Sequence, residues 1–384
     1  MRFFHLSDLH IGKQLHNYTL YEEQSDILNQ IVEKTKEFRP DVILISGDIF
    51  DRTVPSGEAY ELFDQFLLSL SKTNIPVFII AGNHDSPKRL SYASTFLKEH
   101  NIHISVMPPT KEDEFLKKII LDDKWGSVTF YLLPFTKPSY IRHLFSEGEI
   151  TDYDSAIKHL LEREEIDFSK RNVILSHQFY QAGDWETKTC DSEQILISVG
   201  GTDRVDAILL KDFDYSALGH LHGAQRVKFS SIRYSGSPLK YSISEEHHTK
   251  AILMVELEEK GTPAQITSIP LTPLREVRTE KGKLEDILEC FSEGCDDYVR
   301  VILTDEIDPV RPKEKLSAVF SHLLEYRVDN QRTRQYLSKE ETRLEKIEPM
   351  EAFDSFYQEI HKIPLTKSQK TLLEEIMMET EKER

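Results

Sequence analysis

Five short apolar runs in this chain each end in a cluster that contains Asp, Asn or His, and this repeated pattern restricts the possible folds more than any other feature. The runs cover residues 2–6, 42–45, 77–80, 173–175 and 215–218. Apolar runs of this length, bounded by Gly or Asp, are typical of strands buried on both faces. Stretches with helical periodicity lie between the early runs, at residues 22–38 and 57–71. The alternation predicts an α/β domain in which helices flank a sheet.

The clusters after the runs contain seven side chains that can bind a metal ion. They are Asp8, His10, Asp48, Asn83, His177, His220 and His222. Because ligands of open α/β sheets bind where the strands end, these loops can converge at one edge of the sheet. Oxygen and imidazole donors without thiolate suit Mn, Fe or Zn in an open catalytic site better than a structural zinc cage. Seven donors exceed the needs of one tetrahedral ion and match two ions that share a bridging carboxylate, for which Asp48 is the central candidate.

A pair of ions at this edge would suit a reaction at a phosphate group. Two ions about 3.5–4 Å apart would hold a phosphate between them and stabilise both the attacking and the leaving oxygen. His84 directly follows Asn83, so we expect its imidazole to project into the same cavity without binding a metal. It is the candidate general acid, or a cation that stabilises the transition state. Asp51 and Asp85 are predicted to orient imidazoles.

The C-terminal part of the chain differs in composition from the first part. Residues 203–257 are expected to be rich in strands, and a domain boundary is predicted near Pro273. The region from about 275 to 345 is typical of a small α+β module, with a strand predicted at 298–303 and a helix at 313–326. Residues 311–346 hold nine Lys or Arg and six Asp or Glu, so this stretch either contacts phosphates or forms a solvated helix face.

Two amphipathic helices are predicted after residue 347. Pro349 suits the first turn of the first helix, and its apolar face comprises Met350, Phe353, Tyr357 and Ile360. Thr366 followed by Gln369 predicts the capping box of the second helix. Its apolar face comprises Leu372, Leu373, Ile376 and Met377. Because two short helices have little core of their own, they either pack back on the parent domain or bind a partner helix.

The overall composition excludes several classes of protein. The chain has 48 basic and 66 acidic residues, a formal charge of −18, which excludes polybasic binding of nucleic acid but not binding at a local site. Apolar runs stay shorter than the roughly 20 residues of a membrane helix, and the polar N-terminal segment does not fit a secretory signal. Three cysteines without a CxxC pair fit a reducing cytoplasm.

The ligand series resembles the calcineurin-like metallophosphoesterase superfamily. The matching motifs are Asp8-x-His10, Gly47-Asp48-x-x-Asp51, Gly82-Asn83-His84-Asp85, Ser176-His177 and Gly219-His220-x-His222. Longer segments resemble the SbcD family of bacterial nuclease subunits, at residues 5–13, 46–52, 81–87, 197–203 and 213–222. The close resemblance covers about residues 1–240, whereas residues 275–384 match in layout more than in sequence.

This resemblance implies a four-layer αββα phosphoesterase domain over residues 1–273, a small DNA-contacting α+β capping domain over 274–346 and a helical tail over 347–384. By position, it implies a first metal held by Asp8, His10, Asp48 and His222, and a second held by Asp48, Asn83, His177 and His220, with His84 as the catalytic histidine. Manganese is the implied metal. The tail is implied to bind an SbcC-type coiled-coil ATPase, and the phosphoesterase domain to form a homodimer within a heterotetramer.

The activity implied by the resemblance is ATP-dependent double-strand 3′→5′ exonuclease together with single-strand and hairpin endonuclease, in DNA repair, recombination and replication. The chain contains no Gly-x-x-x-x-Gly-Lys-[Ser/Thr] phosphate loop, so ATP would be used by the partner and not by this chain. Two other functions stay open: a metallophosphoesterase for nucleotides, cyclic nucleotides or phosphoproteins, and a non-catalytic scaffold. The additional residues after 273 favour the nuclease subunit over the first, and the complete ligand set with His84 argues against the second.

Overall fold

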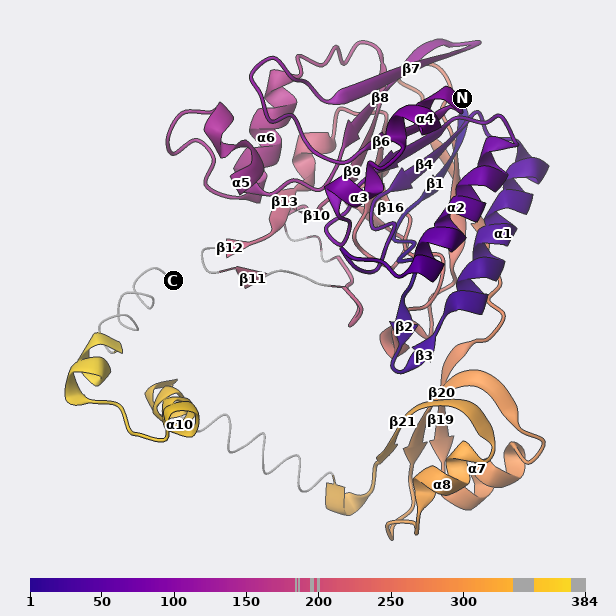
Figure 1. Cartoon of the computed structure of the whole chain (residues 1–384), viewed down its shortest axis with the longest axis vertical. Helices are drawn as coiled ribbons and strands as arrows, with labels where there is room; N and C mark the ends of the chain where they lie inside the picture. The colour runs from indigo at the N-terminus through magenta and orange to yellow at the C-terminus, as the bar shows by residue number, and fades with distance from the viewer. Residues whose placement is uncertain (184, 186, 194–196, 199–200, 334–348, 374–384) are drawn as a thin grey trace. The chain divides into compact units, whose positions relative to one another are not determined.

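The computed structural model describes residues 1–183, 185, 187–193, 197–198, 201–333 and 349–373. The chain divides into two compact units (Figure 1). The first comprises Met1–Thr279, Glu293–Arg300 and Phe320–Glu325, and the second comprises Glu280–Ser292, Val301–Val319 and Tyr326–Arg384. None of the helices in the described residues combines the length and apolarity needed to cross a membrane.

The first sheet of the first unit is built around the N-terminal strand. In order of pairing, its strands are β18 (Gln265–Pro270), β17 (Ala251–Glu256), β1 (Arg2–Leu6), β4 (Val42–Ser46), β5 (Val77–Ile80) and β6 (Ile102–Ser105). Strands β1, β4, β5 and β6 are parallel, and β17 and β18 are antiparallel additions. Helices α1 (Tyr21–Phe38) and α2 (Gly57–Ser71) contact each other and cover one face of this sheet (Figure 1).

The second sheet also has a parallel centre. In order of pairing, its strands are β15 (Gln225–Val227), β16 (Phe229–Tyr234), β14 (Tyr215–Gly219), β9 (Arg171–His177), β8 (Gly126–Leu133) and β7 (Lys117–Asp123). Only the edge pairs β7–β8 and β15–β16 are antiparallel in this sheet. Helices α5 (Pro138–Ile141) and α6 (Tyr153–Arg163) pack on its outer face.

The two sheets face each other across a shared apolar layer, so the predicted four-layer αββα arrangement is confirmed. Strand β4 explains why the runs are continuously apolar, because successive side chains of a strand point to opposite faces. Val42 and Leu44 belong to the layer between the sheets, whereas Ile43 and Ile45 belong to the layer under α1 and α2. Aromatic rings link the sheets, with the ring centres of Phe78 and Phe130 5.2 Å apart.

Short elements connect these layers. They are β2 (Gln14–Leu15), β3 (Tyr18–Thr19), α3 (Pro87–Leu90), α4 (Ser94–Glu99), β10 (Phe179–Gln181), β11 (Ile197–Ser198), β12 (Gly201–Thr202), β13 (Arg204–Asp206) and the 3₁₀ turns η1 (Arg142–Leu144), η2 (Ala207–Leu210) and η3 (Ile243–Glu245). The expectation of a strand-rich segment over 203–257 is confirmed by β13 to β17.

A three-stranded sheet follows the phosphoesterase layers along the chain. Its strands are β19 (Val277–Gly282), β20 (Cys295–Leu303) and β21 (Phe320–Val328), and the helices between them in sequence are α7 (Leu284–Cys290) and α8 (Pro312–Ser317). The strand predicted at 298–303 is confirmed by β20, but the helix predicted at 313–326 is wrong beyond Ser317. The buried residues of β21, Phe320 and Leu324, are four apart, a spacing that fits one face of either a helix or a strand. Pairing with β20 decides in favour of the strand.

Both predicted tail helices are present in the described residues. Helix α10 (Pro349–His361) begins at Pro349 as expected. The capping box is confirmed, because Gln369 Oε1 accepts from Thr366 N at 2.9 Å and Gln369 N donates to Thr366 Oγ1 at 3.4 Å. The helices touch through Lys370 and Asp354, whose Nζ and Oδ2 atoms are 2.6 Å apart. The predicted apolar positions Ile376 and Met377 and residues 334–346 of the basic stretch lie outside the described residues.

Candidate metal centre

The predicted ligands lie at the carboxyl ends of strands from both sheets. Asp8 follows β1, Asp48 follows β4 and Asn83 follows β5, and these three strands are parallel neighbours in the first sheet. His177 ends β9 and is paired with Gly219, the last residue of β14, in the second sheet. The facing sheets therefore bring together loops that are far apart in the sequence, as the run-and-cluster pattern predicts.

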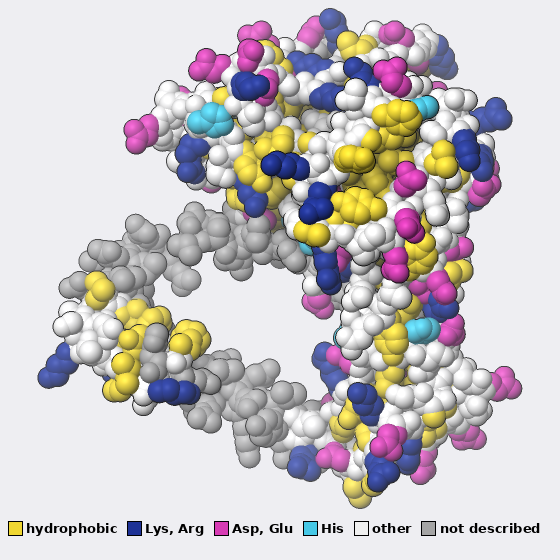
Figure 2. Space-filling model, viewed as in Figure 1, with side chains coloured by type: hydrophobic (Ala, Val, Ile, Leu, Met, Phe, Trp, Pro, Cys, Tyr) yellow, Lys and Arg dark blue, Asp and Glu magenta, His cyan; other side chains and the backbone are white. Residues whose placement is uncertain are grey.

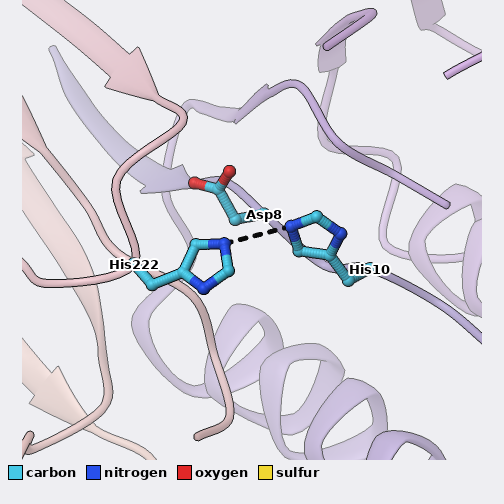
Figure 3. A group of neighbouring side chains, drawn as sticks. All are labelled: Asp8, His10 and His222. Atoms are coloured by element: carbon cyan, nitrogen blue, oxygen red, sulfur yellow. Dashed lines mark hydrogen bonds between the residues drawn. The ribbon is translucent and has the colours of Figure 1, made fainter. Parts of the chain in front are cut away.

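One group of these ligands is drawn in Figure 3, where the rings of His10 and His222 face each other beside the side chain of Asp8. Their donor atoms lie within 4.8 Å of one another, and the Nε2 atoms of His10 and His222 are 3.1 Å apart. All three side chains are buried. Imidazole and carboxylate donors aimed at one point are what a divalent cation requires.

A second group lies on the other side of Asp48. Asn83 Oδ1 is 3.0 Å from His177 Nε2 and 3.1 Å from His220 Nδ1. Asp48 Oδ2 is 3.3 Å from His177 Nε2 and 3.6 Å from His10 Nε2. The structure thus brings all seven predicted residues together and places the Asp48 carboxylate between the two groups.

The backbone at the centre is held in unusual conformations. Asp8, His10, Asp48 and His220 all have positive φ angles, which cost energy for residues other than glycine and persist where the surrounding structure enforces them. The loops also approach one another so closely that only glycine fits at Gly82 and Gly219. A Cβ atom at Gly82 would collide with Asp48, and one at Gly219 would collide with the carbonyl of Ser46.

Replacing Gly219 with alanine is therefore expected to destabilise the protein by about 1–3 kcal/mol, the usual cost of overpacking. The added methyl group would press on the Ser46 carbonyl and would lie 2.7 Å from His177 Nδ1. Thermal unfolding measures the loss. Gly57→Ala is the matched control, because a Cβ at Gly57, the first residue of α2, meets nothing within 4 Å. Equal melting temperatures for the two variants would contradict the close approach.

Burial and the neighbouring charges set the protonation of the centre. Burial lowers the pKa of His10 well below its usual value and that of His220 to about 3, so both imidazoles are neutral at pH 7, the form that binds metal. Burial also disfavours the charged form of His177, but the Asp48 carboxylate outweighs it and raises the pKa of His177 to about 9. Conversely, although burial opposes it, His177 holds the pKa of Asp48 well below its usual range.

The donor set fits a pair of divalent metal ions. In the second group, His177 Nε2 and His220 Nδ1 lie 3.0 and 3.1 Å from Asn83 Oδ1, so three donor atoms converge there. The Nε2 atoms of His10 and His222 face each other across 3.1 Å within a cluster that also contains carboxylates. A cation between such donors satisfies lone pairs that the protein itself leaves unpaired.

His84 lies beside the ligands and is held by two bonds. Its backbone N–H donates to Asp48 Oδ1 at 2.9 Å, and its ring Nδ1 donates to the carbonyl oxygen of Asp51 at 2.8 Å. The ring centre is 4.9 Å from that of His10, and the side chain is half-buried. His84 also belongs to a group of possible metal donors with His10 and Asp48. Its Nε2, opposite the anchored Nδ1, is the ring atom left for chemistry.

The two aspartates predicted to orient imidazoles differ in their contacts. The carboxylate of Asp85 accepts from the backbone N–H groups of Ile49, Phe50 and Gly82, so the prediction for Asp85 is wrong. It ties the loop after β4 to the loop after β5. Asp51 orients His84 through its backbone carbonyl, while its carboxylate pairs with Lys13 at 2.8 Å and lies 3.7 Å from His10 Nδ1.

Other supporting residues were not found from the sequence. Gln24 of α1 accepts from Gly12 N at 2.9 Å and donates to His10 O at 2.7 Å, which fixes the first ligand loop. Glu245 and Lys250 form a buried ion pair behind His222, with an Nζ–Oε2 distance of 2.5 Å. These residues come from separate segments and carry no motif, so only the fold reveals them.

Comparisons with known proteins identify the family of this chain. Residues 1–224 match the family described as calcineurin-like phosphoesterase, and residues 270–361 match the type 5 capsule protein repressor C-terminal domain. The chain is 32% identical to the SbcD subunit of the nuclease SbcCD from Staphylococcus epidermidis over 84% of each chain, and 30% identical to the protein of that name from Staphylococcus saprophyticus over 98% of each. A dimetal phosphatase from Danio rerio aligns over 72% of this chain and 99% of its own, with a TM-score of 0.41 and 13% identity. The chain belongs to the calcineurin-like phosphoesterases and, among them, to the SbcD family.

Proposed function

We propose that this chain is the nuclease subunit of an SbcCD-type complex and hydrolyses phosphodiester bonds of DNA at a centre of two divalent metal ions. The observation that carries this proposal is the convergence of seven donor side chains on both sides of the Asp48 carboxylate, with His84 beside them. The relatives named as nuclease subunits support a nucleic acid as the substrate, and DNA is the nucleic acid we propose. The exonuclease and hairpin endonuclease activities and the role in repair, recombination and replication belong to the same proposal.

The proposed ligand sets follow the two groups of the centre. Asp8, His10, Asp48 and His222 would hold one ion, and Asp48, Asn83, His177 and His220 would hold the other. Mixed oxygen and imidazole donors suit manganese, which is the proposed metal. When bound, two such ions neutralise the phosphate charge and make water a nucleophile at neutral pH.

His84 is the proposed catalytic histidine. Because its Nδ1–H donates to the carbonyl of Asp51, the ring is fixed with Nε2 free to reach a substrate oxygen. A proton on Nε2 can pass to the oxygen that leaves, or can stay there and stabilise the charge on the phosphate. Both roles need the same orientation, which Asp51 and Asp48 provide from the main chain and side chain respectively.

The experiment that tests the proposal compares two substrates with the purified chain and Mn²⁺. Release of nucleotides from linear duplex DNA, in excess over hydrolysis of a small phosphodiester reporter, supports a DNA nuclease. Hydrolysis of the reporter alone would favour a small-molecule phosphodiesterase, and no hydrolysis with or without a coiled-coil ATPase and ATP would favour a scaffold. We place this activity in the cytoplasm, with ATP used by the partner.

The capping domain over residues 274–346 is proposed to contact the DNA. In its described part, Arg311, Lys313 and Lys315 are exposed at helix α8, where Arg311 pairs with Glu314 at 3.6 Å and the two lysines are the candidates for phosphate contacts. Phosphate contacts by such residues position a duplex without reading its sequence.

The tail is proposed to bind the coiled coil of an SbcC-type ATPase. In helix α10, Phe353, Phe356 and Ile360 are 40%, 58% and 57% exposed, so an apolar face is available for a partner helix. Truncation after Lys346 is expected to abolish copurification with the ATPase, while the phosphoesterase domain still folds and binds Mn²⁺. Phe353→Glu is expected to do the same, because a charge in an apolar interface is costly.

Gln358→Glu is the matched control for the tail, since Gln358 is exposed on α10 outside the apolar face. It adds the same charge and should leave partner binding unchanged. Copurification of the truncated chain with the ATPase at full affinity would mean that the interface lies elsewhere. Unfolding or aggregation of the truncated chain would mean that the helices pack on the parent domain.

A homodimer formed through the phosphoesterase domain is part of the proposal. Hydrophobic side chains gather over α3 and α4 on the face seen in Figure 2, where Tyr92 and Phe96 are 83% and 64% exposed. Large apolar side chains exposed together mark an interaction site. Phe96→Glu is expected to yield monomers in light scattering, whereas Thr95→Glu, on the same helix, should not. A wild-type chain that is monomeric at micromolar concentration would contradict this proposal.

A further inference from the structure

The carboxylate of Glu245 is fully buried behind His222 and is satisfied on both oxygens. Oε2 accepts from the ammonium group of Lys250 at 2.5 Å. Lys250 also donates to the carbonyl of His222 at 3.0 Å and to Ser237 Oγ at 2.9 Å, so its position is fixed by three bonds. Oε1 accepts from the backbone N–H of Tyr241 at 3.1 Å. An ammonium group at bonding distance keeps the carboxylate ionised, and an ionised carboxylate can only accept hydrogen bonds.

The hydroxyl group of Ser192 lies between this carboxylate and the His222 ring. Ser192 Oγ is 2.6 Å from Glu245 Oε1 and 2.7 Å from His222 Nδ1. A hydroxyl group has one hydrogen to donate. Since Glu245 can only accept, that hydrogen goes to Glu245, and the short contact with His222 then requires Nδ1–H to donate to the Ser192 oxygen.

The direction of these bonds determines which nitrogen of His222 carries the lone pair. With the hydrogen on Nδ1, the neutral ring presents the lone pair of Nε2. This atom faces the group of Asp8 and His10 in Figure 3, 3.1 Å from His10 Nε2. A histidine that binds a metal commonly donates its other N–H to a carboxylate or carbonyl group, which fixes the tautomer and the ring orientation.

We infer that Ser192 and Glu245, backed by Lys250, form a relay that fixes the Nδ1–H tautomer of His222 and so positions this ligand for one of the two metal ions. The inference rests on the proposed function, since it concerns the same centre. Ser192 and Glu245 are positioning residues, because they act through His222.

The relay supports the metal site that contains His222 and not the one that contains His177. His177, on the other side, makes its Nδ1 contact with the backbone carbonyl of Ser46 at 2.7 Å, a partner that no side-chain substitution removes. Loss of the Ser192 hydroxyl group should therefore weaken one metal site and spare the other. Because Ser192 is half-buried on a loop, its substitution should not disturb the sheets.

The test uses Ser192→Ala, Ser192→Thr and, as a matched control, Ser244→Ala in the full chain. Ser244 also contacts this loop, accepting from Asp191 N at 3.0 Å, but it does not touch His222. Titration calorimetry with Mn²⁺ is expected to show one site weakened about 10–100-fold in Ser192→Ala, the usual cost of removing such a support. Ser192→Thr, which keeps the hydroxyl group, and Ser244→Ala should bind both ions as the wild type does.

A second measurement reads the tautomer directly. Long-range ¹H–¹⁵N spectra of the metal-free, histidine-labelled chain, assigned with His222→Gln, should show the hydrogen of His222 on Nδ1, with a shift toward Nε2 in Ser192→Ala. A wild-type His222 protonated on Nε2, or wild-type Mn²⁺ affinity at both sites of Ser192→Ala, would overturn the inference. A wild-type chain with the Nδ1–H tautomer that binds no Mn²⁺ would count against the proposed function instead, and the tautomer result would still support the relay.

Discussion

Asp48→Ala is expected to remove both metal ions and with them all measurable nuclease activity. The Asp48 carboxylate lies between the two groups of donors, 3.3 Å from His177 Nε2 and 3.6 Å from His10 Nε2. Its loss would also leave His177 without the charge that raises the pKa of its ring. Metal content after gel filtration in Mn²⁺, together with nucleotide release from duplex DNA, measures the effect.

Two further aspartate variants test whether the loss of both ions is specific to Asp48. Asp8→Ala should weaken mainly one ion, because Asp8 is a proposed ligand of one site only, although its carboxylate lies within 4.8 Å of donor atoms in both groups. Asp64→Ala should change nothing, because Asp64 is exposed on helix α2. If Asp48→Ala keeps two tightly bound ions, the bridging role is wrong.

His84→Ala is expected to lower the nuclease rate by about 10²–10⁴-fold, the usual cost of removing a general acid, while two metal ions stay bound. The expectation follows from the anchored ring, whose Nδ1 is bonded to the carbonyl of Asp51 at 2.8 Å. Single-turnover rates with saturating Mn²⁺ separate this effect from metal binding.

His247→Ala is the control for this variant, since the His247 side chain is 91% exposed. It should retain the wild-type rate. Calorimetry decides the role of His84, which also lies within donor distance of His10 and Asp48. Loss of one Mn²⁺ site in His84→Ala would identify this residue as a ligand and overturn its assignment as a general acid.

The sequence predicts those parts of the structure that depend on residues close together in the chain. The apolar run at 77–80 is β5, with every residue buried, because a strand covered on both faces must be apolar throughout. The α/β class and the convergence of the ligands follow from several such runs, each ending in donors, whereas the four-layer arrangement is implied by the family resemblance. The capping box of Thr366 and Gln369 is equally local, since its two residues are three apart.

The parts that the sequence does not predict depend on contacts between distant segments. Ser192 and Glu245 are 53 positions apart, and nothing in either neighbourhood predicts that they meet behind His222. The prediction for Asp85 is wrong because its motif gives its position but not its partners, which are backbone N–H groups of two loops. The helix prediction fails at β21 because pairing with β20, rather than local periodicity, determines the conformation of this segment.

The central place of β1 in its sheet governs when the centre can form during synthesis. Strand β1 is paired on one side with β4 and on the other with β17, which ends at Glu256. A ribosome that adds roughly 5–20 residues per second needs about 12–50 s to pass from Asp8 to the end of β17. During that time the nascent chain holds the first ligand loop beside an incomplete sheet, and His222 and Lys250 are added only late in it. The order of segments along the chain therefore delays completion of the ligand set until His222 has been made, and delays completion of the first sheet until β17 and β18 have followed.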